Sequence, residues 1–146
     1  MSLIDSILLV DDEKLFHLVF DDACSLLDIS LSLKAINTSD AAEEMFKEFH
    51  VNKKSGKPDC VFVDLNLLGS SYDGIELIHR INHIYGNGVV IGIISSSCDP
   101  VEIDKSKLAG AQFWIVKSDN VEPRLEEFKK DFLGFKNRLT PFKVYK

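Results

Sequence analysis

Five polar side chains in this sequence directly follow runs of apolar residues that are typical of buried strands. Asp11 and Asp12 follow ILLV, and Asp64 ends the run CVFVD. Ser95 follows GVVIGII, and Lys117 follows QFWIV. Carboxylates, a hydroxyl and an ammonium are together the groups that can hold a divalent cation and a phosphoryl group. These five residues are therefore candidates for one site, provided that the fold brings them together.

The chemistry open to such a set follows from its charges. Three clustered carboxylates repel one another, so their pKa values rise unless they share a cation. An acidic, all-oxygen site with room for water favours Mg²⁺. An aspartate beside Mg²⁺ is a candidate nucleophile toward phosphorus. The cation would neutralise one phosphoryl oxygen and Lys117 a second, and the hydroxyl of Ser95 with nearby backbone N–H groups would bind a third.

The elements that must position these residues alternate along the chain. Apolar runs predict five strands, at residues 6–10, 31–36, 60–64, 88–94 and 112–116. Helical spacing of apolar residues and helix-start signals predict five helices, at residues 13–28, 39–49, 75–85, 99–109 and 121–139. Ser39 is the expected N-cap of the second helix. Strict alternation predicts a parallel sheet with helices on both faces, and ligands bind beyond the carboxyl ends of such strands.

Composition limits the function classes. The 146 residues, 45% of them hydrophobic, suit one α/β domain over residues 1–146, with its core at about 5–138 and a short tail at 139–146. A formal net charge of −6 argues against a nucleic-acid surface. The three cysteines lack metal-site spacing and are expected to be free thiols. We expect a cytoplasmic protein without membrane contact, because neither a signal peptide nor an apolar run of ~20 residues is visible.

Several motifs around the candidate residues resemble those of the receiver domains of two-component response regulators. The motifs are LLVDDE, VFVDLNL, YDGIEL, IISSS and AGAQFWIVK, and they follow the order of that family. The resemblance implies a single (βα)₅ doubly wound, flavodoxin-like sheet with strand order 2-1-3-4-5. It also implies a phosphorylation-dependent signalling switch. Such a switch turns over no dedicated substrate, but catalyses its own Mg²⁺-dependent aspartyl phosphorylation and dephosphorylation.

The resemblance implies a role for each residue at the phosphorylation site. Asp64 would accept the phosphoryl group, and Lys117 would bind it. Asp12 and Asp64 would bind Mg²⁺ directly, and Asp11 largely through water. The backbone carbonyl of Asn66 would complete the protein ligands of the metal.

The resemblance also implies which residues would respond to phosphorylation and which proteins would take part. Ser95 would be the switch hydroxyl and Trp114 the switch aromatic, and both would respond to the negative charge that phosphorylation adds. The expected phosphoryl donor is a sensor histidine kinase or a phosphotransfer protein, and the expected target is a separate downstream effector protein. Direct nucleic-acid binding is not expected. The resemblance implies homodimerisation through the last helix as one option, and the sequence leaves the oligomeric state open.

Two departures from the receiver pattern affect the surroundings of the site. Leu68 stands where receivers usually have a proline, and the loop at residues 68–73 is longer than usual. Ser118 replaces the proline that usually follows the lysine, so the peptide bond after Lys117 is expected to be trans.

Other functions remain open at the level of the sequence. Asp11 and Asp12 precede a helix and could be plain caps, and a lone lysine at a strand end is usually solvated. A phosphatase with an aspartate nucleophile would place a DxD motif on the first strand, whereas Asp64 ends the third. A receiver-like protein-binding module that is not regulated by phosphorylation is the main alternative to the switch.

Overall fold

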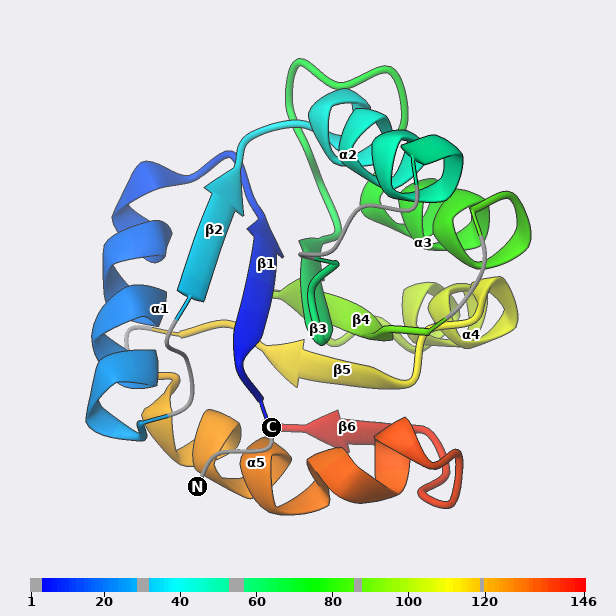
Figure 1. Ribbon diagram of the computed structural model, residues 1–146. Coiled ribbons are helices and arrows are strands. Elements are labelled where there is room, and N and C mark those ends of the chain that lie inside the picture. The colour runs from blue at the N-terminus through cyan, green and yellow to red at the C-terminus, as the bar shows by residue number, and fades with distance from the viewer. Residues whose placement is uncertain (1–3, 29–31, 53–56, 86–87, 119) are drawn as a thin grey trace.

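The computed structural model in Figure 1 describes residues 4–28, 32–52, 57–85, 88–118 and 120–146. Its strands are β1 (Ser6–Val10), β2 (Ser32–Ile36), β3 (Cys60–Asp64), β4 (Val90–Ser95), β5 (Phe113–Val116) and β6 (Lys143–Tyr145). Its helices are α1 (Lys14–Leu26), α2 (Ser39–Asn52), α3 (Gly74–His83), α4 (Pro100–Ala109) and α5 (Glu122–Lys136). The alternation expected from the sequence is confirmed, and most boundaries differ from the expected ones by a few residues.

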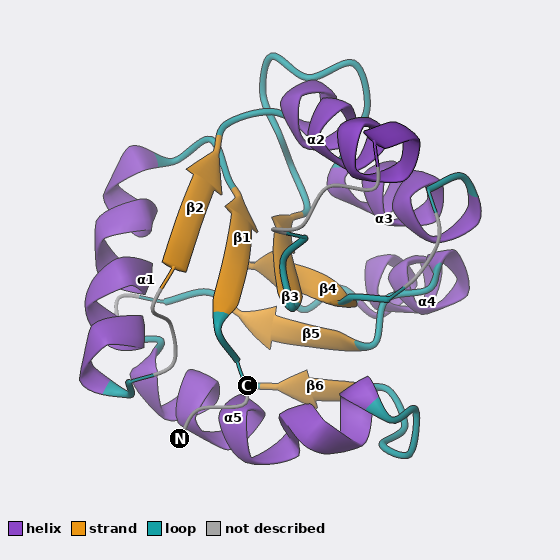
Figure 2. Ribbon diagram, viewed as in Figure 1, coloured by secondary structure: helices purple, strands orange, loops and turns teal. Residues whose placement is uncertain are grey.

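All strands belong to one parallel sheet with the order β2-β1-β3-β4-β5-β6, as Figure 2 shows. The predicted order 2-1-3-4-5 is confirmed, and β6 is added beside β5. Helices α1 and α5 cover one face, and α2, α3 and α4 cover the other. Every residue of β4 is buried, as expected for a strand with neighbours on both sides and helices on both faces. None of the described helices has the length and apolar character needed to span a membrane.

Two hydrophobic clusters, one on each face of the sheet, hold the helices in place. On one face the rings of Phe62 and Phe113 pack against Phe128 of α5, with centroid distances of 5.3 and 4.6 Å. On the other face, Val63 and Trp114 belong to the cluster with the buried side chains of α2 and α3. Side chains of a strand point alternately to the two faces, so consecutive apolar residues supply both clusters.

The start of α2 differs from the expected cap. The side chain of Thr38, rather than that of Ser39, caps this helix by accepting a hydrogen bond from the Ala41 N–H (3.2 Å). Ser39 is completely buried, and its hydroxyl donates to the backbone oxygen of Tyr72 at 2.9 Å. A residue type that often caps a helix here connects the helix to a distant loop instead.

The tail expected at residues 139–146 contains the unpredicted strand β6. Val144 pairs with Trp114, and Tyr145 pairs with Ile115. Tyr145 is buried, and its hydroxyl donates to Asp131 of α5 at 2.7 Å. Lys143 lies 2.8 Å from the same carboxylate. A strand of three residues gives little periodicity to detect, and it is stabilised here by contacts with α5 and β5.

Candidate functional site

The carboxyl ends of β1 and β3 bring the three predicted acidic residues together. One carboxylate oxygen each of Asp11, Asp12 and Asp64 lies within 4.8 Å of the other two. Asp11 is completely buried and Asp64 nearly so, whereas Asp12 is half-buried. Buried carboxylates at this spacing could bind a hard divalent cation, because oxygen ligands and charge neutralisation are what such ions require.

Lys117, at the end of β5, joins the acidic cluster. Its Nζ lies 2.8 Å from Oδ2 of Asp11, 3.2 Å from Oε2 of Glu13 and 3.7 Å from Oδ2 of Asp64. The side chain is only 9% exposed, and its Nζ also sits 4.5 Å from the ring centroid of Phe16. Burial by itself would lower the pKa of Lys117, but the carboxylates of Asp11 and Asp64 outweigh it and raise that pKa. The amine is therefore held in its charged form among the acids.

Asp11 has unused capacity to accept a ligand. Its Oδ1 accepts a hydrogen bond from the Glu13 N–H at 2.8 Å. Its Oδ2 is buried and, beyond the ion pair with Lys117, makes no hydrogen bond of regular geometry. Buried carboxylate oxygens are normally satisfied, so the orientation of Asp11 fits a cation bound at this cluster.

The electrostatics of Asp64 differ from those of an ordinary surface aspartate. Burial and then the neighbouring Asp11 raise the pKa of Asp64 to about 7, while Lys117 acts in the opposite direction. Asp12 raises the pKa further, and the backbone N–H of Asn66 lowers it. The fold thus holds this carboxylate where its charge is disfavoured unless a cation is supplied.

The loop that follows β3 contacts the cluster through its backbone. The Leu68 N–H donates to Oδ2 of Asp12 at 2.9 Å. The Gly74 N–H donates to the Leu65 oxygen at 3.0 Å and closes the loop. A Cβ atom on Gly74 would lie 2.1 Å from the backbone oxygen of Asp64, so only glycine fits there. Asn66 is exposed at the start of this loop.

Ser95 and Trp114 both contact the backbone of Ser97. The buried Ser95 hydroxyl accepts from the Ser97 N–H at 3.1 Å, and the Trp114 Nε1–H donates to the Ser97 oxygen at 3.0 Å. The Lys117 N–H donates to the Ser95 oxygen at 2.7 Å and ties the ends of β4 and β5 together. The described residues contain no cis peptide bond, so the bond between Lys117 and Ser118 is trans, as expected.

Comparisons with known proteins identify solved structures with a similar fold. A response regulator from Cytophaga hutchinsonii has 21% identity and a TM-score of 0.74, with 90% of this chain and 98% of that chain covered. The phosphorylated cyanobacterial phytochrome response regulator RcpA has 20% identity and a TM-score of 0.71, with coverages of 92% and 94%. The chain has the fold of response-regulator receiver domains.

A further receiver, the Mn²⁺-bound form of response regulator Rcp1, has 20% identity and a TM-score of 0.63, with coverages of 93% and 94%. No protein-family model matches the chain. No curated protein matches it either. At these identities the similarity shows the receiver fold only. What the site can bind is inferred from the distances and burial of its own residues.

Two residues at this end of the receiver fold were given no role from the sequence. Glu13 was part of a recognised motif but unassigned, and it contacts Lys117 at 3.2 Å. His17 belongs to none of the motifs recognised in the sequence, yet its Nε2 pairs with the backbone oxygen of Asp11. Its position in the first turn of α1, five residues after Asp12, is the signal that could have identified it. The N-cap of α1 is Glu13, so neither aspartate before it is that helix's N-cap residue.

Proposed function

We propose that this chain is a phosphorylation-dependent signalling switch that accepts a phosphoryl group on Asp64. The phosphoryl donor would be a histidine kinase or a phosphotransfer protein of a two-component phosphorelay. The observation that supports the proposal is the convergence of three carboxylates and the Lys117 amine, from β1, β3 and β5, at one edge of the sheet. The receiver fold of the chain is consistent with it.

Mg²⁺ is the proposed cofactor. Asp11, Asp12 and Asp64, with the backbone carbonyl of Asn66, would hold the ion. The buried Oδ2 of Asp11 is ion-paired with Lys117 but accepts no hydrogen bond of regular geometry, which is consistent with this. The Mn²⁺-bound form of Rcp1 is a precedent for a divalent cation on a similar fold. When bound, the cation would neutralise the carboxylates and one phosphoryl oxygen.

The residues of the chain would then position the phosphoryl group. A carboxylate oxygen of Asp64 would form the new bond to phosphorus as the bond to the donor's imidazole nitrogen breaks, and the released imidazole would take up a proton. Lys117 is near enough to Asp64 to neutralise one phosphoryl oxygen. The Ser95 hydroxyl accepts from the Ser97 N–H, so its own proton remains available for another phosphoryl oxygen. Each such charge-assisted hydrogen bond contributes about 1.5–3 kcal/mol.

The backbone of Ser97 links the Ser95 hydroxyl to the Trp114 side chain, so a change at Ser95 on phosphorylation could reach Trp114. Movement of the Ser95 hydroxyl toward a phosphoryl group would disturb its bond with the Ser97 N–H. The same residue accepts the hydrogen bond from Trp114, which pairs with Val144 of β6. We infer that Trp114 responds to phosphorylation and alters the affinity for a separate effector protein, or for a second copy of the chain, at the side of the sheet formed by β5 and β6.

The decisive test is incubation with acetyl phosphate and Mg²⁺, followed by intact-mass measurement. We expect the mass of one added phosphoryl group in the wild type and its loss in Asp64→Asn. The matched control is Asp99→Asn, because Asp99 is an exposed N-cap of α4 where asparagine caps equally well. Rapid turnover of many phosphate esters would indicate a phosphatase instead. Absence of an adduct and of Mg²⁺ binding would leave a protein-binding module.

A further inference from the structure

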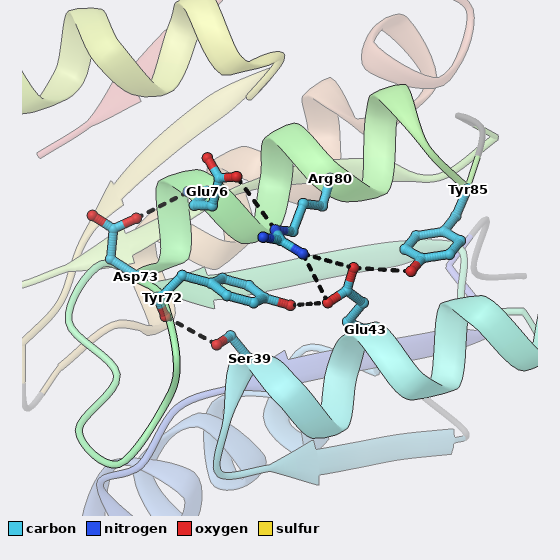
Figure 3. A network of polar contacts seen from close by, with 7 residues as sticks. All are labelled: Ser39, Glu43, Tyr72, Asp73, Glu76, Arg80 and Tyr85. Atoms are coloured by element: carbon cyan, nitrogen blue, oxygen red, sulfur yellow. Dashed lines mark hydrogen bonds and ion pairs between the residues drawn. The ribbon is translucent and has the colours of Figure 1, made fainter.

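The loop between β3 and α3 is bound to the first turn of α2, as Figure 3 shows for Ser39. The Ser39 hydroxyl donates to the Tyr72 oxygen at 2.9 Å, and the Ser39 N–H donates to the hydroxyl of Ser70 at 3.0 Å. The Ser71 N–H donates to Oδ2 of Asp40 at 2.9 Å. Three consecutive loop residues therefore have partners on α2, which lies far from them in the sequence.

Glu43, one turn further along α2, is the centre of a second set of contacts with this region (Figure 3). Its carboxylate accepts from the hydroxyl of Tyr72 and, at 2.9 Å, from that of Tyr85. Arg80 of α3 donates to both carboxylate oxygens at 3.3 Å. The guanidinium lies 4.3 Å from the ring centroid of Tyr72 and is also paired with Glu76. Tyr72, the last loop residue before the N-cap of α3, is thus held through its hydroxyl and its ring.

The Glu43 carboxylate is held in its ionised form by the hydrogen-bond donors around it. The side chain of Glu43 is only 18% exposed. Burial by itself would raise its pKa, but the hydrogen bonds from Tyr72, Tyr85 and Arg80 outweigh burial and lower that pKa. Burial and the Glu43 carboxylate raise the pKa of Tyr72, so its phenol keeps the proton that it donates. At neutral pH the network joins an ionised acceptor to three donors, which is the stronger class of hydrogen bond.

The same loop reaches the candidate metal site at its other end. The Leu68 N–H donates to Oδ2 of Asp12 at 2.9 Å. Receivers usually have a proline at this position, and proline has no N–H to donate. Gly69 follows with a φ of 76°, a conformation that glycine adopts without strain. Leu68, which stands where receivers usually have proline, therefore makes a backbone contact with Asp12 that proline could not make.

We propose that Glu43 is a positioning residue for the metal site, acting through the loop of residues 66–73. By holding Tyr72 it fixes the end of the loop, and the loop in turn holds the Leu68 N–H against Asp12. The inference rests on the proposed function, because it assigns the tuning of metal affinity to the same site. The ties to α2 would supply the rigidity that the missing proline would otherwise provide.

The test is Mn²⁺ affinity, measured by the electron paramagnetic resonance signal of the free ion in titrations of the full chain. Glu43→Gln removes the negative charge at the centre of the network. Tyr72→Phe removes only the phenolic hydroxyl that donates to Glu43. We expect both variants to bind Mn²⁺ about 10-fold more weakly than the wild type, as is typical when a partner behind a metal ligand is lost. Glu44→Gln is the matched control, because Glu44 is the exposed neighbour of Glu43 on α2 and should leave the affinity unchanged.

Thermal melting in the same buffers separates positioning from a merely structural role. A Glu43→Gln variant that melts earlier but binds Mn²⁺ like the wild type would overturn the inference. If Glu43→Gln fails to fold, the Mn²⁺ affinity of Tyr72→Phe tests the inference, because this variant keeps the aromatic ring and Glu43. A ¹⁵N spectrum adds a local readout, in which the Leu68 amide resonance should shift in Tyr72→Phe. A wild type that binds no Mn²⁺, or an Asp64→Asn variant that binds as well as the wild type, would instead refute the proposed metal site.

Discussion

Removing the charge of Asp64 should stabilise the metal-free protein. The folded state raises the pKa of this carboxyl from 3.8 to about 7. Between these values the folded protein binds more protons than the unfolded chain, so the free energy of unfolding falls as the pH rises. The loss is complete above pH 7 and absent below about pH 4. Asparagine has nearly the same shape and no charge, so Asp64→Asn should escape this loss.

The size of the effect follows from the shift in the pKa. A rise of about 3 units corresponds to roughly 4 kcal/mol, since each unit is about 1.4 kcal/mol. The side chain is 12% exposed and next to Lys117, and relaxation around the charge reduces the value further. We therefore expect Asp64→Asn to gain on the order of 2–3 kcal/mol at pH 8 in a chelating buffer, and close to nothing at pH 4.

Urea unfolding of both proteins at pH 8 and at pH 4, in EDTA and in Mg²⁺, measures this difference. In saturating Mg²⁺ the wild type should recover stability by ligand linkage, whereas the variant should gain little. Asp99→Asn, at an exposed cap, should behave as the wild type throughout. Equal or lower stability of Asp64→Asn at pH 8 in EDTA would refute the reasoning, because it would mean that the acidic cluster does not strain the folded state.

Three further substitutions test other parts of the structure by urea unfolding. Lys117→Met leaves the buried Asp11 without its partner, so we expect a loss of about 3–5 kcal/mol in metal-free buffer; a smaller loss would show that the ion pair contributes little. Gly74→Ala forces a Cβ to within 2.1 Å of the Asp64 oxygen and should cost about 1–3 kcal/mol and weaken Mg²⁺ binding, unless the loop shifts freely. Tyr145→Ala should cost about 3–5 kcal/mol, and unchanged stability would mean that β6 is not bound in solution.

The sequence by itself was sufficient for the alternation of the first five strands with the five helices and for the residues at the acidic cluster. Burial of a strand on one or both faces produces an alternating or continuous run of apolar residues, which is visible in the sequence. Parallel strands place their carboxyl ends on one edge of the sheet, so the sequence alone predicts that Asp11, Asp64 and Lys117 meet there. Both inferences depend only on local periodicity and on chain order.

Only the tertiary structure revealed the contacts between elements that no local pattern encodes. Glu43 reads as an ordinary exposed helix residue, because its partners Tyr72 and Arg80 come from another loop and helix. Ser39 has the sequence signal of a cap, but packing brings the Tyr72 carbonyl to its hydroxyl. Strand β6 forms because α5 presents Asp131 to Lys143 and Tyr145. Such pairings depend on how elements pack in three dimensions, and that packing is decided by the fold as a whole.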